Sequence, residues 1–300
     1  MSIWPNMKAA IISPSAPSTH TPERKAQFEA GLKNLEMLGF DCAVGMHAKN
    51  ALSFVSDTAE NRLADLVAAY GDKSVEIIIA ANGGWNGGDL LSEIDWELIR
   101  NNPRPLVGFS DTTVLLNATF AATHSIQIHG PMVTWGFSEN DETTNEYFKQ
   151  AIDNRKSELP TDEFGKFLRG GSLEGIGVGG NLISLETLLG TPYEPDWRGK
   201  ILFWEETEET LYRVLRSLSH FKNAGVWDKI SGMIIGHLDR IDGKFADTET
   251  DPLQAILEHL KPYGFPIIKT ELFGHGTKTQ LCLPVGGKIK ADDESIIFGF

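Results

Sequence analysis

Cysteine is nearly absent from this chain of 300 residues, which holds only Cys42 and Cys282. Small secreted proteins that are held together by disulfides need more cysteines than this, so the sequence excludes such a scaffold. The first ten residues contain one lysine and lack the apolar stretch of a secretory signal peptide. We therefore expect a reduced, cytoplasmic protein.

Long hydrophobic runs and basic clusters are also lacking. The longest apolar runs, such as residues 77–81, are far shorter than the roughly 18 residues of a membrane span. Acidic residues outnumber basic ones by 41 to 27, which gives a formal net charge of −14. A chain without a large basic region is poorly suited to a phosphate backbone, so we expect neither nucleic acid nor a membrane as a partner.

The remaining composition is that of a globular enzyme-sized protein. Hydrophobic residues make up 41% of the chain and charged residues 23%, and the sequence contains no internal repeat. A chain of this length is typical of about two domains.

The first half of the chain alternates short apolar runs with amphipathic stretches. The Thr21-Pro22-Glu23 sequence is typical of a helix start, and residues 75–80 form a nearly unbroken apolar run, typical of a strand buried on both faces. The expected strands are 8–12, 40–44, 75–80, 106–109 and 125–129, and the expected helices are 21–38, 58–70 and 111–122. This order predicts a doubly wound, mostly parallel α/β sheet of flavodoxin-like or amidotransferase-like type.

The second half begins with a change of composition. Residues 139–162 are polar with little strand signal, and a glycine cluster follows between positions 170 and 180. Helices are expected at 181–189, 211–221 and 252–260, and strands at 199–204, 230–235, 267–271, 281–285 and 296–298. We predict an N-terminal α/β domain over 1–137, a linker over 138–174 and a C-terminal α/β domain over 175–300, with the active site between the two domains.

Ser110 stands where a nucleophile would be expected. Gly108-Phe109-Ser110-Asp111 joins a predicted buried strand to a predicted helix, and backbone N–H groups at a helix start can hold an oxyanion. A simpler interpretation is that Ser110 or Asp111 only caps the helix. The complete G-x-S-x-G motif is absent because Thr112 replaces its second glycine.

A glycine-rich loop follows the predicted strand at 75–80. Gly83 and Gly84 would allow the backbone to approach a ligand closely and could supply a second oxyanion donor, although a plain turn is the simpler interpretation. Residues 83–88 read GGWNGG, which is not the G-x-G-x-x-G pattern of a dinucleotide site. We therefore expect no nucleotide cofactor.

An acid and a base for such a nucleophile must come from elsewhere in the chain. Glu205 and Glu206 end a predicted strand, where one could orient a histidine or simply favour a helix start. His129, His237 and His275 each follow a predicted strand, and each could equally be structural. Their spacing with Asp239 and Asp242 matches no metal motif, so we expect no metal.

Several ordered stretches resemble the LD-carboxypeptidase family of serine peptidases, which includes the microcin C self-immunity peptidases. Each stretch alone is a weak signal, but their order over nearly the whole chain is a strong one. They are Ser13–Pro17, Ile77–Gly84, Leu90-Leu91 with Ile94-Asp95, Val107–Thr113, His129–Pro131, Gly179–Leu182 with Leu189–Tyr193, Gly199–Glu206, and Gly274-His275 with Leu283–Gly286.

The resemblance implies roles for five residues. Ser110 would be the nucleophile, His275 the general base and Glu205 its orienting acid, while Glu206 stands where the family often has Asp. The backbone N–H groups of Gly84 and Asp111 would form the oxyanion hole. The resemblance also implies a cytoplasmic homodimer that acts on a small peptide-like substrate and needs no metal or cofactor.

The sequence departs from the family pattern at the glycine loop. Murein-recycling members usually read R-G-G-Y-G with a further arginine shortly after, whereas here Asn82 precedes the glycines and Gly88-Asp89 follows them. This loop resembles the microcin-immunity branch more closely. Because a free carboxylate favours a bidentate cation, the expected chemistry is better supported than the expected substrate.

These observations predict a serine carboxypeptidase or amidase with a Ser-Glu-His triad, most directly one that cleaves an LD-peptide bond of a murein peptide. One alternative is a microcin-immunity-like hydrolase of peptidyl- or aminoacyl-nucleotide antibiotics. Two others are a catalytically inactive binding protein of the same fold and a metal-dependent amidase.

Overall fold

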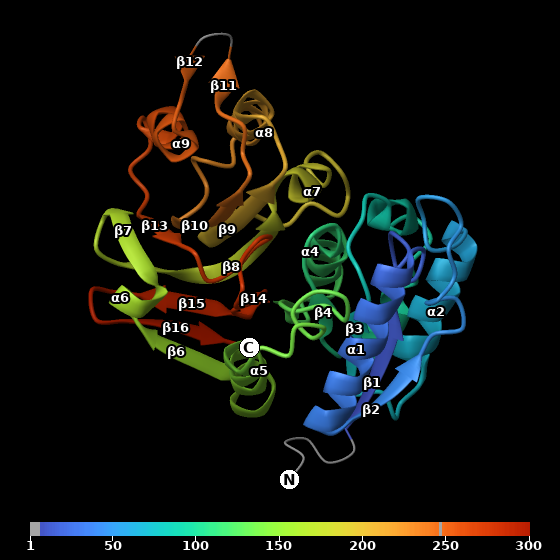
Figure 1. The fold of residues 1–300 in the computed structure, drawn as a ribbon. Helices are drawn as coiled ribbons and strands as arrows, with labels where there is room; N and C mark the ends of the chain where they lie inside the picture. Colours follow the sequence, from blue (N-terminus) through green and yellow to red (C-terminus); the bar gives the residue numbers. More distant parts are fainter. Residues whose placement is uncertain (1–6, 246–247) are drawn as a thin grey trace.

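The structure is a computed structural model that describes residues 7–245 and 248–300. Two β-sheets lie side by side, with helices around and between them (Figure 1). The first sheet has the strand order β14-β5-β4-β3-β1-β2, and the second has the order β6-β16-β15-β8-β9-β10-β13-β7. This arrangement confirms the predicted fold class, a mostly parallel α/β sheet joined to a second α/β unit.

The first sheet is built almost entirely from the first half of the chain. Its strands are β1 (Met7–Ile12), β2 (Phe40–Val44), β3 (Ile77–Ala80), β4 (Leu106–Gly108), β5 (Gln127–His129) and β14 (Leu283–Val285). The helices of this half are α1 (Pro22–Leu38), α2 (Ala59–Gly71), the 3₁₀ helix η1 (Gly87–Leu90), α3 (Trp96–Asn101) and α4 (Thr112–Thr123). β1 to β5 pair in parallel, whereas β14 pairs antiparallel with β5.

Helix starts and strand burial follow the local sequence. The Thr21 hydroxyl accepts from the amide of Arg24, with Pro22 at the first helical position, so α1 begins as predicted. All four residues of β3 are buried, which is the burial expected of an unbroken apolar run inside a parallel sheet.

The second sheet comes from the second half of the chain. Its strands are β6 (Lys156–Pro160), β7 (Gly165–Arg169), β8 (Leu173–Asn181), β9 (Lys200–Thr207), β10 (Gly232–Asp239), β13 (Ile267–Thr270), β15 (Lys288–Ala291) and β16 (Ser295–Gly299), and a separate hairpin pairs β11 (Lys244–Phe245) with β12 (Thr248–Glu249). The accompanying helices are α5 (Glu142–Lys149), the π-helix η2 (Gln150–Asn154), α6 (Thr161–Phe164), α7 (Leu182–Glu186), α8 (Leu211–Asn223) and α9 (Pro252–Leu260).

The polar stretch that was expected to have little strand structure is more ordered than its composition indicates. It contains α5 and β6, and the predicted linker, which extends to residue 174, also contains β7. β6 and β7 form the two edges of the second sheet. Only alternate residues of β6, Ser157 and Leu159, are buried, so an edge strand with one solvated face carries a weak apolar signal. The glycine cluster likewise contains a strand, β8, which sequence analysis did not predict.

Helix α4 lies between the two sheets (Figure 1). Its residues from Thr112 to Thr119 are all buried, as expected of a helix covered on every side. Ser110 lies just before α4. The position of α4 between the sheets therefore places Ser110 close to the second sheet.

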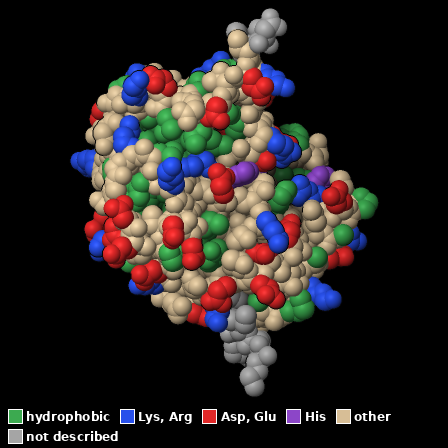
Figure 2. Space-filling model, turned by 60° about the vertical axis from the view of Figure 1, so that its left-hand side comes forward, with side chains coloured by type: hydrophobic (Ala, Val, Ile, Leu, Met, Phe, Trp, Pro, Cys, Tyr) green, Lys and Arg blue, Asp and Glu red, His purple; other side chains and the backbone are tan. Residues whose placement is uncertain are grey.

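In the described part of the chain, no helix is both long and apolar enough to cross a membrane. On the face shown in Figure 2, acidic side chains are interspersed with lysines and arginines, and no wholly basic area is present.

Candidate active site

Ser110 occupies a sharp turn between β4 and α4. Its φ angle of 58° lies in the left-handed region, which is strained for a residue other than glycine, and strained residues cluster at functional sites. A Cβ atom on Gly83 would lie only 2.6 Å from Ser110 Oγ, so the glycine loop passes directly beside the hydroxyl. The serine is thus presented at the carboxyl end of the sheet, where open α/β sheets bind ligands.

Two backbone amides near Ser110 are free to bind a ligand. Within the described residues, the N–H groups of Gly84 and Asp111 donate to no protein acceptor. Gly84 has a φ of +148°, and a Cβ atom there would lie 2.5 Å from the amide nitrogen of Ala16, so only glycine fits. The buried Asp111 carboxylate accepts from Gly87 N at 2.7 Å and from the Ser15 hydroxyl. These bonds fix the glycine loop and the loop after β1 to the start of α4.

Glu205 and His275 form a buried pair from different elements. Glu205 lies on β9 and is fully buried, and its Oε2 accepts from His275 Nδ1 at 2.8 Å and from the His275 amide at 2.9 Å. His275 stands between Gly274 and Gly276, which both have positive φ. A Cβ on Gly274 would lie 2.7 Å from Glu205 Cβ, so the glycine permits this close contact.

The Glu205 carboxylate makes the His275 imidazole a stronger base. Burial opposes the charge on each group, but their mutual attraction and hydrogen bonds outweigh it. The pKa of Glu205 therefore lies below its ordinary value and the pKa of His275 lies above its own. With Nδ1 held by the carboxylate, Nε2 of the imidazole is the nitrogen left for a proton transfer.

Glu206 has a different environment from its neighbour. Its carboxylate accepts from Asn181 Nδ2 at 2.8 Å, from Ile183 N at 3.0 Å and from Thr207 N at 3.0 Å. Burial and the adjacent charge of Glu205 nevertheless raise the pKa of Glu206 to about 7. Glu205, and not Glu206, contacts the histidine.

Buried hydrogen bonds between α4 and β8 dock the two halves of the site. Asn117 on α4 donates to Gly179 O at 2.9 Å and accepts from Gly179 N at 3.1 Å. Thr113 Oγ1 accepts from Asn181 N at 2.9 Å. Since Asn181 pairs with Glu205 across β8 and β9, these bonds fix the carboxylate relative to the helix that follows Ser110.

Ser110 and His275 line the same cavity of about 550 Å³, which is bordered by loops from both sheets. Gly83, Gly84, Trp85 and Glu206 also line it. Among the described residues, Ser110 Oγ makes no hydrogen bond, to His275 or any other group. Resting enzymes often hold nucleophile and base slightly apart until substrate binds.

The other two candidate histidines do not line this cavity. His129 is fully buried among Phe109, Phe203 and Phe273, with ring centroids 5.5–6.0 Å apart. His237 pairs with Glu271. Of the three, only His275 combines a carboxylate partner with access to Ser110.

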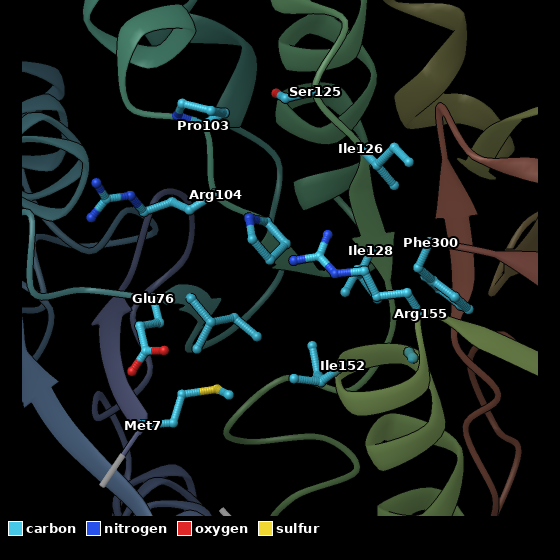
Figure 3. Close-up of a pocket in the computed structure, with 13 residues that line it drawn as sticks. Met7, Glu76, Pro103, Arg104, Ser125, Ile126, Ile128, Ile152, Arg155 and Phe300 are labelled. Carbon is cyan, nitrogen blue, oxygen red and sulfur yellow. The ribbon is translucent and has the colours of Figure 1, made fainter.

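A second hollow of about 510 Å³ lies near the opposite ends of the first-sheet strands. Figure 3 shows Met7, Arg155 and Phe300 around it. Its lining contains none of the residues predicted for catalysis.

Three further residues line the cavity of Ser110 and His275 but were not singled out in the sequence. Arg24 from α1, Trp135 and Arg240 line it together with the predicted residues. Trp135 follows the His129-Gly130-Pro131 stretch, which is the one signal that could have indicated it. Arg24 lies in an ordinary amphipathic helix and carries no such signal.

Comparison with known proteins decides the family. The profile of the LD-carboxypeptidase N-terminal domain matches residues 9–130, and that of the LD-carboxypeptidase C-terminal domain matches residues 174–291. A probable murein peptide carboxypeptidase of Bacillus subtilis is 30% identical, covering 93% of this chain and 86% of its own length. The chain belongs to the LD-carboxypeptidase family. It is a serine-type carboxypeptidase, as the sequence predicts.

Other LD-carboxypeptidase relatives fall into both branches considered above. The microcin C7 self-immunity protein MccF of Escherichia coli is 28% identical, covering 94% of this chain and 89% of its own. A solved structure of MccF with aspartyl sulfamoyl adenosine matches with a TM-score of 0.87 at 26% identity, covering 100% of this chain and 97% of that one. Muramoyltetrapeptide carboxypeptidase from Oxalobacter formigenes matches with a TM-score of 0.84 at 26% identity, covering 98% and 99%.

Proposed function

We propose that this carboxypeptidase hydrolyses an LD-peptide bond of a murein peptide with Ser110 as nucleophile, His275 as general base and Glu205 as the acid that orients the base. The observation that carries the proposal is the buried Glu205–His275 pair, which shares a cavity with a strained serine. Three groups in these relations match the arrangement needed to activate a hydroxyl.

The proposed reaction proceeds through an acyl-enzyme. His275 Nε2 takes the Ser110 proton as Oγ attacks the scissile carbonyl, and it then delivers that proton to the departing amine. The N–H groups of Gly84 and Asp111 stabilise the oxyanion, each contributing about 3 kcal/mol to lowering the barrier. Water then attacks the acyl-enzyme, with His275 again as base, and releases the acid product.

The second candidate function is hydrolysis of a peptidyl- or aminoacyl-nucleotide antibiotic. Asn82 before the glycine loop favours it, because murein-recycling members usually have arginine there. A substrate panel separates the two candidates. A murein tetrapeptide and an aminoacyl sulfamoyl adenosine are each incubated with the enzyme, and release of the terminal amino acid or of the nucleotide is measured.

The Ser110→Ala variant is the matched control for both substrates. We expect kcat to fall by several orders of magnitude, with stability changed by about 1 kcal/mol or less. A serine-directed acylating reagent should add one acyl mass to the wild-type chain and none to the variant. Wild-type turnover in the variant would refute the triad, and an unlabelled, inactive wild type would identify a binding protein.

We also propose that the chain works in the cytoplasm as a homodimer, as the family resemblance implies, with the small peptide-like substrate as its partner and no metal or cofactor. Light scattering on the purified protein tests the oligomeric state. Activity that is lost with a chelator and restored by zinc would refute the metal-free mechanism.

A further inference from the structure

An outer hollow, separate from the one shown in Figure 3, adjoins the cavity of Ser110 and His275 on the side of the glycine loop. It has a volume of about 510 Å³ and is lined by Pro17, His20, Ser53 and Phe54 together with residues of the catalytic cavity. The residues that line both are Ala16, Arg24, Asn82 and Trp85. The two spaces therefore meet at Arg24, beside the loop that carries the proposed oxyanion donor Gly84.

The outer hollow is bordered by exposed aromatic side chains. Trp85 is 77% exposed and Phe54 is 63% exposed, although both are large and apolar. Exposed apolar surface that borders a cavity is typical of ligand binding. Aromatic side chains such as these favour packing against the face of another ring, because the contact removes apolar surface of both rings from water.

Arg24 is the cation that remains available at this junction. The catalytic cavity also contains Arg240, but its guanidinium already pairs with Asp239 at 2.9 Å and with Glu208 at 2.6 Å. Within residues 7–245 and 248–300, Arg24 pairs with no carboxylate. Its contacts are Gln27 Oε1 at 3.3 Å and the face of Trp135, 5.4 Å from the ring centre.

The other charged residues of the cavity show why the unpaired guanidinium of Arg24 matters for substrate binding. The cavity lining is acidic, but Glu208 and Asp239 pair with Arg240, and Glu209 pairs with Arg213. Arg24 is therefore the arginine of the lining whose charge no carboxylate of the described residues offsets, so it can attract an anionic substrate. The guanidinium of Arg24 lies over the Trp135 ring, which does not neutralise its charge. The N–H groups of the guanidinium can therefore bind a carboxylate, phosphate or sulfamate in a bidentate manner.

We propose that Arg24 binds an anionic group of the substrate and that Trp85 and Phe54 receive a ring attached beyond that group. The inference rests on the proposed function, since it assigns a two-point subsite to the same substrate. Two substrate sources share this chemistry: a murein peptide still joined to its sugar, and an aminoacyl nucleotide with an anionic linker and a base.

The test measures binding separately from catalysis. All variants are built on Ser110→Ala, and dissociation constants are measured by calorimetry for muramoyl-tetrapeptide, for the free tetrapeptide, for aspartyl sulfamoyl adenosine, and for an uncharged amide analogue of each anionic group. Because no turnover is needed, failure of the triad proposal would not affect this result, whereas the substrate panel above tests the triad alone.

Arg24→Gln should weaken binding of the anionic ligand tenfold or more, leave the uncharged analogue within about twofold, and be partly rescued by Arg24→Lys. The matched control Lys25→Gln removes a neighbouring exposed charge and should change neither. Phe54→Ala should weaken only the ring-bearing ligand, with Met37→Ala, another exposed apolar residue, as its control.

If Phe54→Ala weakens binding of muramoyl-tetrapeptide but not of the free tetrapeptide, the substrate is a murein peptide joined to its sugar. If it weakens binding of aspartyl sulfamoyl adenosine instead, the substrate is an aminoacyl nucleotide. Equal losses with charged and uncharged ligands would overturn the role of Arg24. Equal losses with and without the ring would overturn the role of Phe54. Either result alone, or unchanged affinity for every ligand, rejects the two-point subsite.

Discussion

His129 lies near the Glu205–His275 pair and has a separate effect on stability. Neither ring nitrogen has a hydrogen-bond partner among the described residues. Burial, more than any neighbouring charge, lowers the pKa of His129 to about 4 from a reference value of 6.5. The folded protein therefore keeps this imidazole neutral at pH values where the unfolded chain protonates it.

We expect stability to fall as the pH drops from about 6.5 to 4, because the unfolded chain then binds a proton that the folded chain refuses. The loss due to His129 is roughly 3 kcal/mol at the lower pH. His129→Leu should remove this acid-side loss and leave the free energy of unfolding near pH 8 equal or higher. Urea unfolding of the wild type, His129→Leu and the exposed-histidine control His220→Gln across this pH range measures it. An unchanged acid slope in His129→Leu would contradict the account.

The adjacent glutamates should respond differently to the same substitution. Glu205→Gln replaces an acceptor of the His275 N–H with an amide that can stabilise the wrong tautomer, so kcat should fall by roughly three to four orders of magnitude. Glu206 contacts no histidine, and its pKa of about 7 means that it is often neutral already. Glu206→Gln should therefore lose at least a hundredfold less activity. Steady-state kinetics of both variants decide, and equal losses would point to a shared role.

At the scale of elements, α4 and β8 hold the two halves of the site together. Asn117 is fully buried and satisfies both backbone polar groups of Gly179. Asn117→Leu would leave these groups without a partner in the core, which costs roughly 2–4 kcal/mol. The urea midpoint should fall without a change in slope, and kcat should fall as well because Ser110 is displaced.

The control for that substitution is Asn223→Leu at the exposed end of α8, which should leave both quantities nearly unchanged. A destabilised Asn117→Leu with full kcat would show that the docking bonds are not needed to place Ser110.

The elements also show what the sequence can and cannot predict. Strands β3 and β4 are apolar runs buried along their whole length, and β1 is buried from Ala9 to Ile12, so their composition alone indicates them. β8 is rich in glycine because other segments of the same chain pack closely against it: a Cβ on Gly179 would lie 1.8 Å from Phe203 O, and one on Gly180 would lie 2.2 Å from Thr113 Oγ1. Such tertiary contacts remove the residues that usually indicate a strand.

The same distinction holds for the site. Ser110 and His275 lie in short motifs beside glycines, so resemblance indicates them. Arg24 acquires its significance only when α1 brings it over Trp135, more than a hundred residues away. No local sequence pattern predicts this contact between Arg24 and Trp135.

At the scale of the whole molecule, β14 links the two sheets. It completes the edge of the first sheet by pairing with β5, and the turn after it exchanges hydrogen bonds with Gly177 of β8. Leu283 on β14 is fully buried. Leu283→Ala should cost about 2–5 kcal/mol and destabilise both sheets together, so that unfolding remains one cooperative transition at a lower midpoint.

Measuring the hydrogen-exchange protection of the strands in each sheet tests this prediction. Parallel loss of protection in β4 and β9 is expected. Two separate transitions, with only the first sheet affected, would show that β14 does not couple them.

The pairing of β14 with β5 also sets an order of events during translation. The ribosome makes β5 about 150 residues before it makes β14, which corresponds to roughly 8–30 s at common synthesis rates. Throughout that interval the nascent first sheet has an unpaired edge, and such an edge is a template for pairing with other chains. The nascent protein is therefore most exposed to aggregation before its last strands emerge, and chaperone dependence should be greatest for chains that stall in this interval.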